Sequence, residues 1–398
     1  MKKLLLAASA CALMAGAATA EDVKLGILIG FTGPIESLTK HMAAGAELAM
    51  AEVDASGKAK NNYISVRGDS TCVDAAAATA AAERMITAEG VKGIIGGDCS
   101  GVTRAALTNV AMPNGIVMIS PAATSPALSS DPDNGLFFRT SPSDAREGEV
   151  MADILVEKGV KSIALTYSNS DYGKGLAEAI SSAFIAKGGV VTINAAHDDG
   201  KADYSAEVSA LAAAGGDLLV VAGYLDQGGK GIVQASLDSG AFTTFGLPGG
   251  MVGDGLPAAI GPALDGSYGQ VAQSDSPGAA ILTEMGKASA NPFDATSPYS
   301  MESYDAAALI MLAIEASGST DSNVYKEKVM EIANGPADGS GVKIMPGELG
   351  KALELLAEGK AIDYDGASGV TLIGPGESAG RYKEFIVKDG KYETVKFR

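Results

Sequence analysis

The sequence contains no tryptophan, and only two histidines and three cysteines among its 398 residues. The two histidines, His41 and His197, lie far apart, and neither belongs to an HExxH motif or to a cysteine–histidine cluster with zinc spacing. We expect no nucleophile elbow of the kind that marks many serine hydrolases. We therefore expect both histidines to be surface residues, and we expect no catalytic site and no metal site.

Long apolar runs are confined to the start of the chain. Lys2 and Lys3 precede the apolar stretch 4–18, and Ala18-Thr19-Ala20 has the small-x-small pattern of a cleavage site. This arrangement predicts a signal peptide over residues 1–20, cleaved after Ala20. The stretch is too short for a comfortable membrane span, and no later run equals it. We expect the mature chain to be exported to the periplasm.

Export makes the few cysteines informative. Cys11 lies in the predicted signal peptide, and a lipoprotein anchored through it is an alternative, although Ala8-Ser9-Ala10 before it lacks the usual leucine. If Cys11 is removed, Cys72 and Cys99 remain, and two thiols in an oxidising compartment most simply form one disulfide. Two separate buried thiols are the other possibility.

Positive charge is scarce. Two of the 30 Lys and Arg residues lie in the predicted signal peptide, which leaves 28 against 48 Asp and Glu and a mature net charge of −20. This balance argues against nucleic acid or an anionic membrane surface as a partner. It does not predict a cationic ligand, because solubility explains an acidic surface equally well.

Strand-like and helix-like segments alternate along the mature chain, which predicts an α/β fold. The expected strands of a first series are 23–29, 64–67, 93–96 and 116–119, with helices over 41–53, 74–88 and 102–110. The second series has strands 162–167, 190–194 and 217–222 and a short one at Phe245, with helices over 146–158, 174–187, 204–214 and 230–239. Two doubly wound, Rossmann-like sheets are the simplest interpretation. Beyond this alternation the two halves share no visible repeat.

Two strand ends in the first series carry small hydroxyl-bearing turns. The apolar run 93–96 leads to Asp98-Cys99-Ser100-Gly101, and the run 116–119 leads to Ser120-Pro121-Ala122-Ala123-Thr124. Because parallel strands end at the same edge of a sheet, where open α/β sheets bind ligands, the two turns would form a receptor for a carboxylate. Ordinary strand–helix turns with capping hydroxyls are the alternative.

Glycine-rich segments offer no nucleotide site. The segment 26–33 follows a strand but lacks the G-x-G-x-x-G spacing, and 228–231 lacks the Ser or Thr that follows the lysine of a phosphate-binding loop. We expect no cofactor.

Short motifs spread over nearly the whole mature chain resemble the periplasmic leucine/isoleucine/valine-binding proteins, which deliver amino acids to ABC transporters. The order and spacing of the motifs carry the resemblance more than any one of them. They are Val23-Lys24-Leu25-Gly26, Thr32-Gly33-Pro34, Gly45-Ala46-Glu47, Ile119 to Thr124, Asp171-Tyr172-Gly173, Gly223-Tyr224, Glu302 to Ala306 and Tyr364 to Gly369.

The resemblance implies a type I periplasmic binding protein, with two lobes joined by a three-strand hinge. The N-terminal lobe would comprise 21–141 and 272–365, and the C-terminal lobe 142–271 and 366–398. The chain would cross between the lobes near 140–144, 268–273 and 364–380. The family also often bridges the positions of Cys72 and Cys99, in agreement with the disulfide expected above.

The matching positions imply roles in ligand binding. Ser100 and Thr124 would hold a ligand carboxylate, and the backbone carbonyl of Ala122 would accept a hydrogen bond from an α-ammonium group. Tyr172 and Tyr224 would close over the ligand from the second lobe. Tyr304, at the start of a predicted helix, would form a wall of the cleft.

Two departures from the family pattern leave the ligand open. Members that bind branched-chain amino acids have an aromatic residue near Leu38 and an acid at the position of Gly249. A buried ammonium group without a counter-charge would be costly. Either a nearby acid replaces the missing one, or the ligand is a small carboxylate or amide without an α-ammonium group. The candidate acids are Glu36, Asp98, Asp226, Asp254 and Glu302.

These features together predict a monomeric periplasmic receptor that passes an amino acid, amide or small carboxylate to the membrane permease of an ABC transporter. An exported subunit that presents its ligand to a receptor kinase would use the same cleft and remains an alternative. A dehydrogenase with a doubly wound domain is disfavoured by the missing dinucleotide motif and by the export signal.

Overall fold

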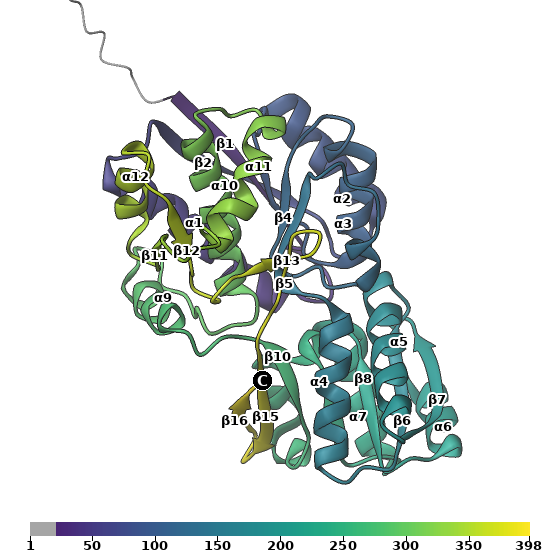
Figure 1. The fold of residues 1–398 in the computed structure, drawn as a ribbon. Coiled ribbons are helices and arrows are strands. Elements are labelled where there is room, and N and C mark those ends of the chain that lie inside the picture. The colour runs from purple at the N-terminus through teal and green to yellow at the C-terminus, as the bar shows by residue number, and fades with distance from the viewer. Residues whose placement is uncertain (1–20) are drawn as a thin grey trace, which may run out of the picture.

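The computed structural model describes residues 21–398, so the expected signal peptide, its cleavage site and Cys11 lie outside the described residues. Two α/β lobes are stacked one above the other (Figure 1). Each lobe contains a seven-stranded sheet, which confirms the predicted fold class. A small third sheet pairs β11 (Val342–Ile344) with β12 (Ile362–Tyr364).

The first five strands of the two large sheets follow the same order, whereas the last two follow opposite chain orders. In the first lobe the order is β2 (Asn61–Asp69), β1 (Glu21–Ile29), β3 (Ile94–Gly96), β4 (Met118–Ser120), β5 (Phe137–Pro142), β14 (Glu377–Ser378) and β13 (Leu372–Ile373). In the second it is β7 (Val190–His197), β6 (Ser162–Ser168), β8 (Leu218–Ala222), β9 (Phe245–Leu247), β10 (Tyr268–Ala272), β15 (Tyr382–Lys388) and β16 (Lys391–Phe397). The two lobes therefore share the order of these five strands as well as the alternation of strands and helices, although their sequences show no repeat.

Pairing within the first sheet places the two hydroxyl-bearing turns side by side. Strands β3 and β4 are parallel neighbours, with Ile94 opposite Met118 and Ile95 opposite Ile119. Their carboxyl ends therefore lie at one edge, as the sequence predicted.

Helices cover both faces of each sheet (Figure 1). Those of the first lobe are α1 (Glu36–Ser56), α2 (Ala75–Glu83), α3 (Ser100–Ala106), α9 (Pro277–Ala288), α10 (Ser300–Ser317), α11 (Ser322–Asn334) and α12 (Leu349–Ala357). Those of the second are α4 (Asp144–Glu157), α5 (Asp171–Ala186), α6 (Ser205–Ala214), α7 (Lys230–Ser239) and α8 (Gly255–Ile260). Six single-turn segments complete the list: η1 (Arg84–Glu89), η2 (Leu107–Ala111), η3 (Pro126–Ser129), η4 (Leu225–Gly229), η5 (Gly249–Met251) and η6 (Gly261–Leu264).

Capping side chains fix several helix starts. Asp74 caps α2, because its carboxylate accepts from the N–H groups of Ala76 and Ala77. Ser143 caps α4 and Ser170 caps α5 in the same way. Ser143 comes just after β5 and Ser170 just after β6, at the ends of these strands that face the cleft between the lobes. The two caps therefore fix where α4 and α5 begin beside the cleft.

The chain crosses between the lobes three times. The first crossing joins β5 to α4, and the second joins β10 to α9. The third differs from the boundary expected after residue 365. Strands β13 and β14 still belong to the first sheet, so the chain enters the second lobe between Ser378 and Tyr382 (Figure 1). Two-residue strands carry too little apolar pattern to be recognised in a sequence.

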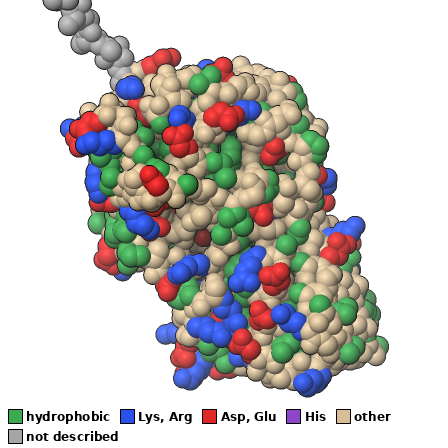
Figure 2. Space-filling model, viewed as in Figure 1, with side chains coloured by type: hydrophobic (Ala, Val, Ile, Leu, Met, Phe, Trp, Pro, Cys, Tyr) green, Lys and Arg blue, Asp and Glu red, His purple; other side chains and the backbone are tan. Residues whose placement is uncertain are grey.

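The surface mixes charges of both signs on the face shown in Figure 2. No helix within residues 21–398 is both long enough and apolar enough to span a membrane.

The expectation of a surface position was wrong for His197. This residue ends β7 and is only 2% exposed. Its Nδ1 lies 2.8 Å from the hydroxyl of Thr166, and its ring stands edge-on to Tyr204 with centroids 6.2 Å apart. Burial lowers the pKa of His197 to about 4, so the imidazole is neutral at physiological pH.

Candidate ligand-binding site

A cavity lies between the lobes at the carboxyl edges of both sheets. Its free volume in this structure is only about 20 Å³. The residues that line it are Ile35, Leu38, Asp98, Cys99, Ser100, Ala122, Tyr172, Tyr224, Gly250 and Tyr299. Both lobes contribute lining residues, because the loops that follow the parallel strands of the two facing sheets converge at one place.

Ser100 joins the two turns of the first lobe. It begins α3, and its hydroxyl accepts a hydrogen bond from the backbone N–H of Ser125 across 3.1 Å. Thr124 precedes Ser125 in the second turn, and its hydroxyl is buried without a hydrogen-bond partner among the described residues. The two hydroxyl-bearing turns are thus in direct contact, and one of them retains an unused hydroxyl group.

Asp98 connects the first turn to two neighbouring loops through hydrogen bonds. Its carboxylate accepts from the N–H of Gly30 at 2.7 Å and from the hydroxyl of Ser70 at 2.8 Å. Burial raises the pKa of Asp98, while these hydrogen bonds oppose the rise. Both oxygens are therefore already engaged in holding the loops that follow β1 and β2.

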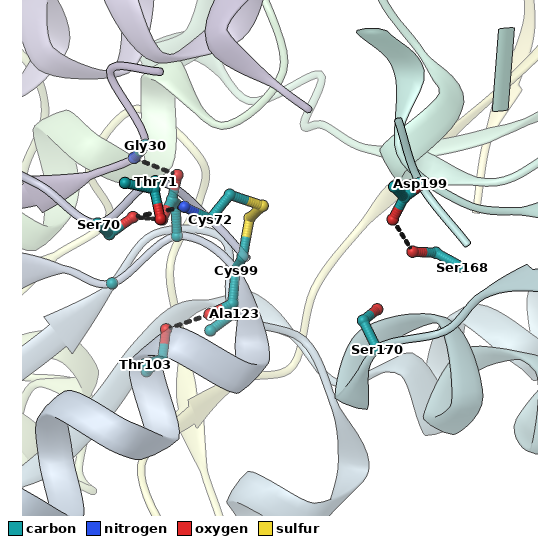
Figure 3. The surroundings of a disulfide bond; sticks show 12 residues. Gly30, Ser70, Thr71, Cys72, Cys99, Thr103, Ala123, Ser168, Ser170 and Asp199 are labelled. Atoms are coloured by element: carbon teal, nitrogen blue, oxygen red, sulfur yellow. Dashed lines mark hydrogen bonds between the residues drawn. A yellow bond between two sulfur atoms is a disulfide. The ribbon is translucent and has the colours of Figure 1, made fainter. Parts of the chain in front are cut away.

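The disulfide between Cys72 and Cys99 is present, as expected (Figure 3). It ties the loop after β2 to the residue directly before Ser100. In Figure 3, Ser168, Ser170 and Asp199 of the second lobe face it across the opening between the lobes. Cys72, Ser170 and Asp199 also line one groove at this opening.

Arg139 fixes the second turn from the interior. Its guanidinium group, 1% exposed, donates to the carbonyls of Ala123 and Ser125 at 3.1 and 2.9 Å. It also pairs with Glu377 on β14. The backbone on either side of Thr124 is therefore held by a buried charged group, which favours a preformed site.

Two tyrosines form the wall from the second lobe. Tyr172 lies in the first turn of α5, and Tyr224 follows β8. Their rings stack with centroids 5.0 Å apart and an angle of 25° between the planes. The hydroxyl of Tyr172 accepts from the N–H of Gly250 at 3.0 Å, which holds the loop after β9 against the stack.

Behind this wall lie two buried acids that the sequence analysis missed. Asp144 and Glu147 stand one turn apart at the start of α4, and each is at most 1% exposed. Glu147 accepts from the N–H of Gly249 at 2.7 Å and from the amide of Gln270 at 3.2 Å. Both carboxyl oxygens of Asp144 lack a hydrogen-bond partner among the described residues. The sequence does carry one signal for them: the two acids lie three residues apart, directly after the predicted first crossing.

Burial sets the protonation of this pair. It raises the pKa of Glu147 to about 7, and the pKa of Asp144 rises well above its ordinary value because of burial and the adjacent charge of Glu147. Around neutral pH the pair therefore retains protons that exposed carboxylates would have lost.

Direct contacts hold the lobes together at both sides of the cavity. Asp226 of the second lobe accepts from the N–H and hydroxyl of Ser37 at 3.1 and 2.7 Å, and its own N–H donates to the carbonyl of Pro34 at 2.9 Å. On the other side Arg104 and Asp171 form an exposed ion pair at 3.7 Å. The structure is thus a closed arrangement.

A family model for periplasmic binding proteins matches residues 22–335. The chain belongs to this family. A curated relative, the Leu/Ile/Val-binding protein homolog 3 of Brucella melitensis, is 29% identical over 345 residues, which cover 83% of this chain and 89% of the relative.

Solved structures of two transport proteins share the fold of this periplasmic binding protein. The branched-chain amino acid transporter substrate-binding protein LivJ of Streptococcus pneumoniae, in complex with isoleucine, has a TM-score of 0.75 at 20% identity, covering 94% of this chain and 99% of that one. A solute-binding protein of an ABC transporter from R. palustris, in complex with benzoate, has a TM-score of 0.74 at 19% identity, covering 94% and 96%.

The residues expected to bind ligand separate into two groups in this periplasmic binding protein. Ser100, Ala122, Tyr172 and Tyr224 line the cavity. Thr124, Gly249, Glu36 and Tyr304 do not. Thr124 and Gly249 are each one or two residues from a lining residue, whereas Glu36 is exposed at the start of α1.

Tyr304 points away from the cavity. Its side chain is fully buried, and its hydroxyl donates to Glu52 of α1. Tyr299, which the sequence analysis did not single out, lines the cavity in its place. Its φ of 64° turns the backbone sharply just before α10, a conformation that a sequence pattern does not reveal for a tyrosine.

Proposed function

We propose that this chain is the substrate-binding component of an ABC transporter, which captures one small amino acid between its lobes and delivers it to a membrane permease. The observation that carries the proposal is the cavity lined by both lobes at the carboxyl edges of their sheets. Each half of the site comes from a separate sheet, so a ligand bound there favours the closed form.

The residues that line the cavity, and Thr124 beside it, each have a chemical role in this proposal. The hydroxyls of Ser100 and Thr124 hold the ligand carboxylate, and the carbonyl of Ala122 accepts from its ammonium group. Tyr172, Tyr224 and Tyr299 enclose the rest of the ligand. Tyr299 replaces Tyr304 in this role because the hydroxyl of Tyr304 is committed to Glu52.

Closure completes the site. In an open form the first-lobe turns face water, and the second lobe adds its tyrosines when it swings shut on the three crossings. Exclusion of water then strengthens every hydrogen bond to the ligand. The contacts between Ser37 and Asp226 would lock this state, which is the form that docks on a permease.

The relatives support an amino acid over the other ligand classes, and transport over sensing. One is named for leucine, isoleucine and valine, and a structural neighbour holds isoleucine. Another neighbour holds benzoate, so the fold alone does not set the ligand. We further propose that the mature chain begins at Glu21 after cleavage of the signal peptide, and that it acts as a monomer.

A ligand screen of the purified chain 21–398 tests the proposal. Thermal shift identifies binders among the twenty amino acids, benzoate, 4-hydroxybenzoate, acetamide and urea, since a ligand that binds only the folded state raises apparent stability. Calorimetry then measures affinity. We expect at least one amino acid with a micromolar or lower Kd, equivalent to about −8 kcal/mol. Binding of no amino acid, or tighter binding of benzoate, would overturn the assignment.

A further inference from the structure

Gly249 stands where the family pattern leads one to expect an acid, and the side chain of Glu147 fills the space beside it. A Cβ placed on Gly249 would lie 3.3 and 3.6 Å from the two carboxyl oxygens of Glu147, and 2.9 Å from the hydroxyl of Tyr299. The N–H of Gly249 donates to Glu147 across 2.7 Å. A carboxyl group is therefore present at this corner of the site, but it comes from α4 instead of the loop after β9.

Within residues 21–398, the pair of Glu147 and Asp144 has no free counter-charge. Arg139 is the cationic group beside it, and its guanidinium is engaged with two carbonyls, with Ser129 and with Glu377. The other groups that face the pair are neutral: the amide of Gln270 and the hydroxyls of Tyr172, Tyr299 and Tyr382, whose pKa values rise through burial and the charges of the pair. Two buried acids without a cation are costly unless they hold a proton or receive a positive group.

The pair lies close behind the cavity wall. Tyr172, Tyr299 and Gly250 line the cavity. Gly250 follows Gly249 in the chain and contacts Tyr172, and the hydroxyl of Tyr299 lies against Gly249 itself. Tyr299 belongs to the first lobe, whereas Glu147 and Gly249 belong to the second. The first lobe therefore supplies one of the groups that cover this corner of the second lobe in the closed arrangement.

We propose that Glu147, backed by Asp144, receives the ammonium group of the bound amino acid and releases a proton to solvent as it does so. This inference rests on the proposed function. The proton balance is simple: the carboxylic acid loses its proton, the ammonium group keeps its three, and the ion pair that forms is neutral overall. A ligand with a carboxylate alone, such as benzoate, would leave Glu147 protonated and would gain no ion pair from it.

Calorimetry with two matched ligands tests the proposal. The probes are L-leucine and 4-methylpentanoate, which has the same carbon skeleton without the ammonium group. Titrations near pH 7 in buffers of different ionisation enthalpy count the protons released. We expect release of roughly half a proton per L-leucine bound, because an acid that titrates near that pH is about half protonated. We expect 4-methylpentanoate to bind far more weakly and to release none.

Two variants on one helix separate the role of Glu147 from a general loss of charge. Glu147→Gln should weaken L-leucine binding about 30-fold or more and abolish proton release. Glu149→Gln removes the same charge from an exposed position of α4 and should change neither. Circular dichroism shows whether each variant folds, and the proton count in the wild type tests the idea even where a variant does not.

The outcomes distinguish this inference from the function on which it rests. L-leucine affinity within threefold of wild type in Glu147→Gln, or binding without proton release, would refute the role of Glu147 and leave the transport function intact. Equal affinity for 4-methylpentanoate would refute it as well. If another amino acid from the screen binds in place of leucine, it and its own deaminated analogue become the probes. If no amino acid binds the wild type, the proposed function fails and this inference fails with it.

Discussion

The carboxylate of Asp226 in the second lobe accepts two hydrogen bonds from Ser37 in the first, at 2.7 Å from the hydroxyl and 3.1 Å from the backbone N–H. Ser37 lies in the first turn of α1, and Asp226 lies two residues after Tyr224. The contact spans the opening of the cavity, so its strength bears directly on how readily the lobes separate.

Asp226→Ala should favour the open form. Removing this acceptor leaves the two donors of Ser37 to water, and each lost hydrogen bond is worth about 1 kcal/mol. We expect roughly a tenfold loss of affinity for L-leucine and a larger radius of gyration in X-ray scattering of the free protein. Asp238→Ala, at an exposed site on α7, is the matched control. Identical scattering and affinity in the two variants would show that Ser37 and Asp226 do not hold the closed state.

Ser100→Ala combined with Thr124→Ala should weaken binding severely without unfolding the protein. Hydrogen bonds to a charged group contribute about 1.5–3 kcal/mol each, so two lost contacts to a carboxylate predict a decrease of 100-fold or more. The melting temperature should fall only slightly, because the hydroxyl of Thr124 has no hydrogen-bond partner in the part of the chain that the structure describes and that of Ser100 has one. Calorimetry and circular dichroism measure the two effects.

The control for this double variant is Thr79→Ala with Ser209→Ala. Both hydroxyls bond only to backbone carbonyls on exposed helix faces. Unchanged affinity in Ser100→Ala/Thr124→Ala would remove the carboxylate assignment.

Glu302→Gln should stabilise the protein at alkaline pH. Burial raises the pKa of Glu302 to about 8, with a further contribution from Asp305. A folded-state pKa above the unfolded value of about 4.5 means that the ionised form is disfavoured in the fold, so this group lowers stability as pH rises from about 4.5 to about 8. The glutamine side chain does not ionise, so the variant does not lose stability over this pH range.

Urea unfolding at several pH values measures the difference. We expect the two proteins to differ by less than about 1 kcal/mol at pH 5 and by roughly 5 kcal/mol at pH 9, with the variant more stable. A difference that does not change with pH would contradict a raised pKa for Glu302.

Loss of the disulfide should reduce both stability and affinity. The bond closes a loop across a separation of 27 residues, and loops of that size correspond to about 3 kcal/mol. Cys99 directly precedes Ser100, so Cys72→Ser with Cys99→Ser should also loosen the carboxylate-binding turn. Urea unfolding gives the first effect and calorimetry the second. If stability falls but affinity is kept, the bond serves the fold alone.

Much of the architecture was readable from local patterns. Alternating apolar runs and helical periodicity predicted the two sheets, and the turns after β3 and β4 were placed together because parallel strands end at one edge. The cysteine pairing followed from having two thiols in an exported chain. Ser100, Ala122, Tyr172 and Tyr224 could be named because motif spacing marks positions along a chain.

Other features depended on which segments meet in space. The lobe boundary expected after residue 365 was placed too early because β13 and β14 are too short to leave a pattern. His197 was misjudged because its burial comes from Thr166 and Tyr204 on other elements. The sequence alone determined that position 249 has no side chain and that acids occupy 144 and 147. Only the tertiary structure brought Glu147 against Gly249, because that contact joins residues 102 positions apart through the packing of α4 beside β10.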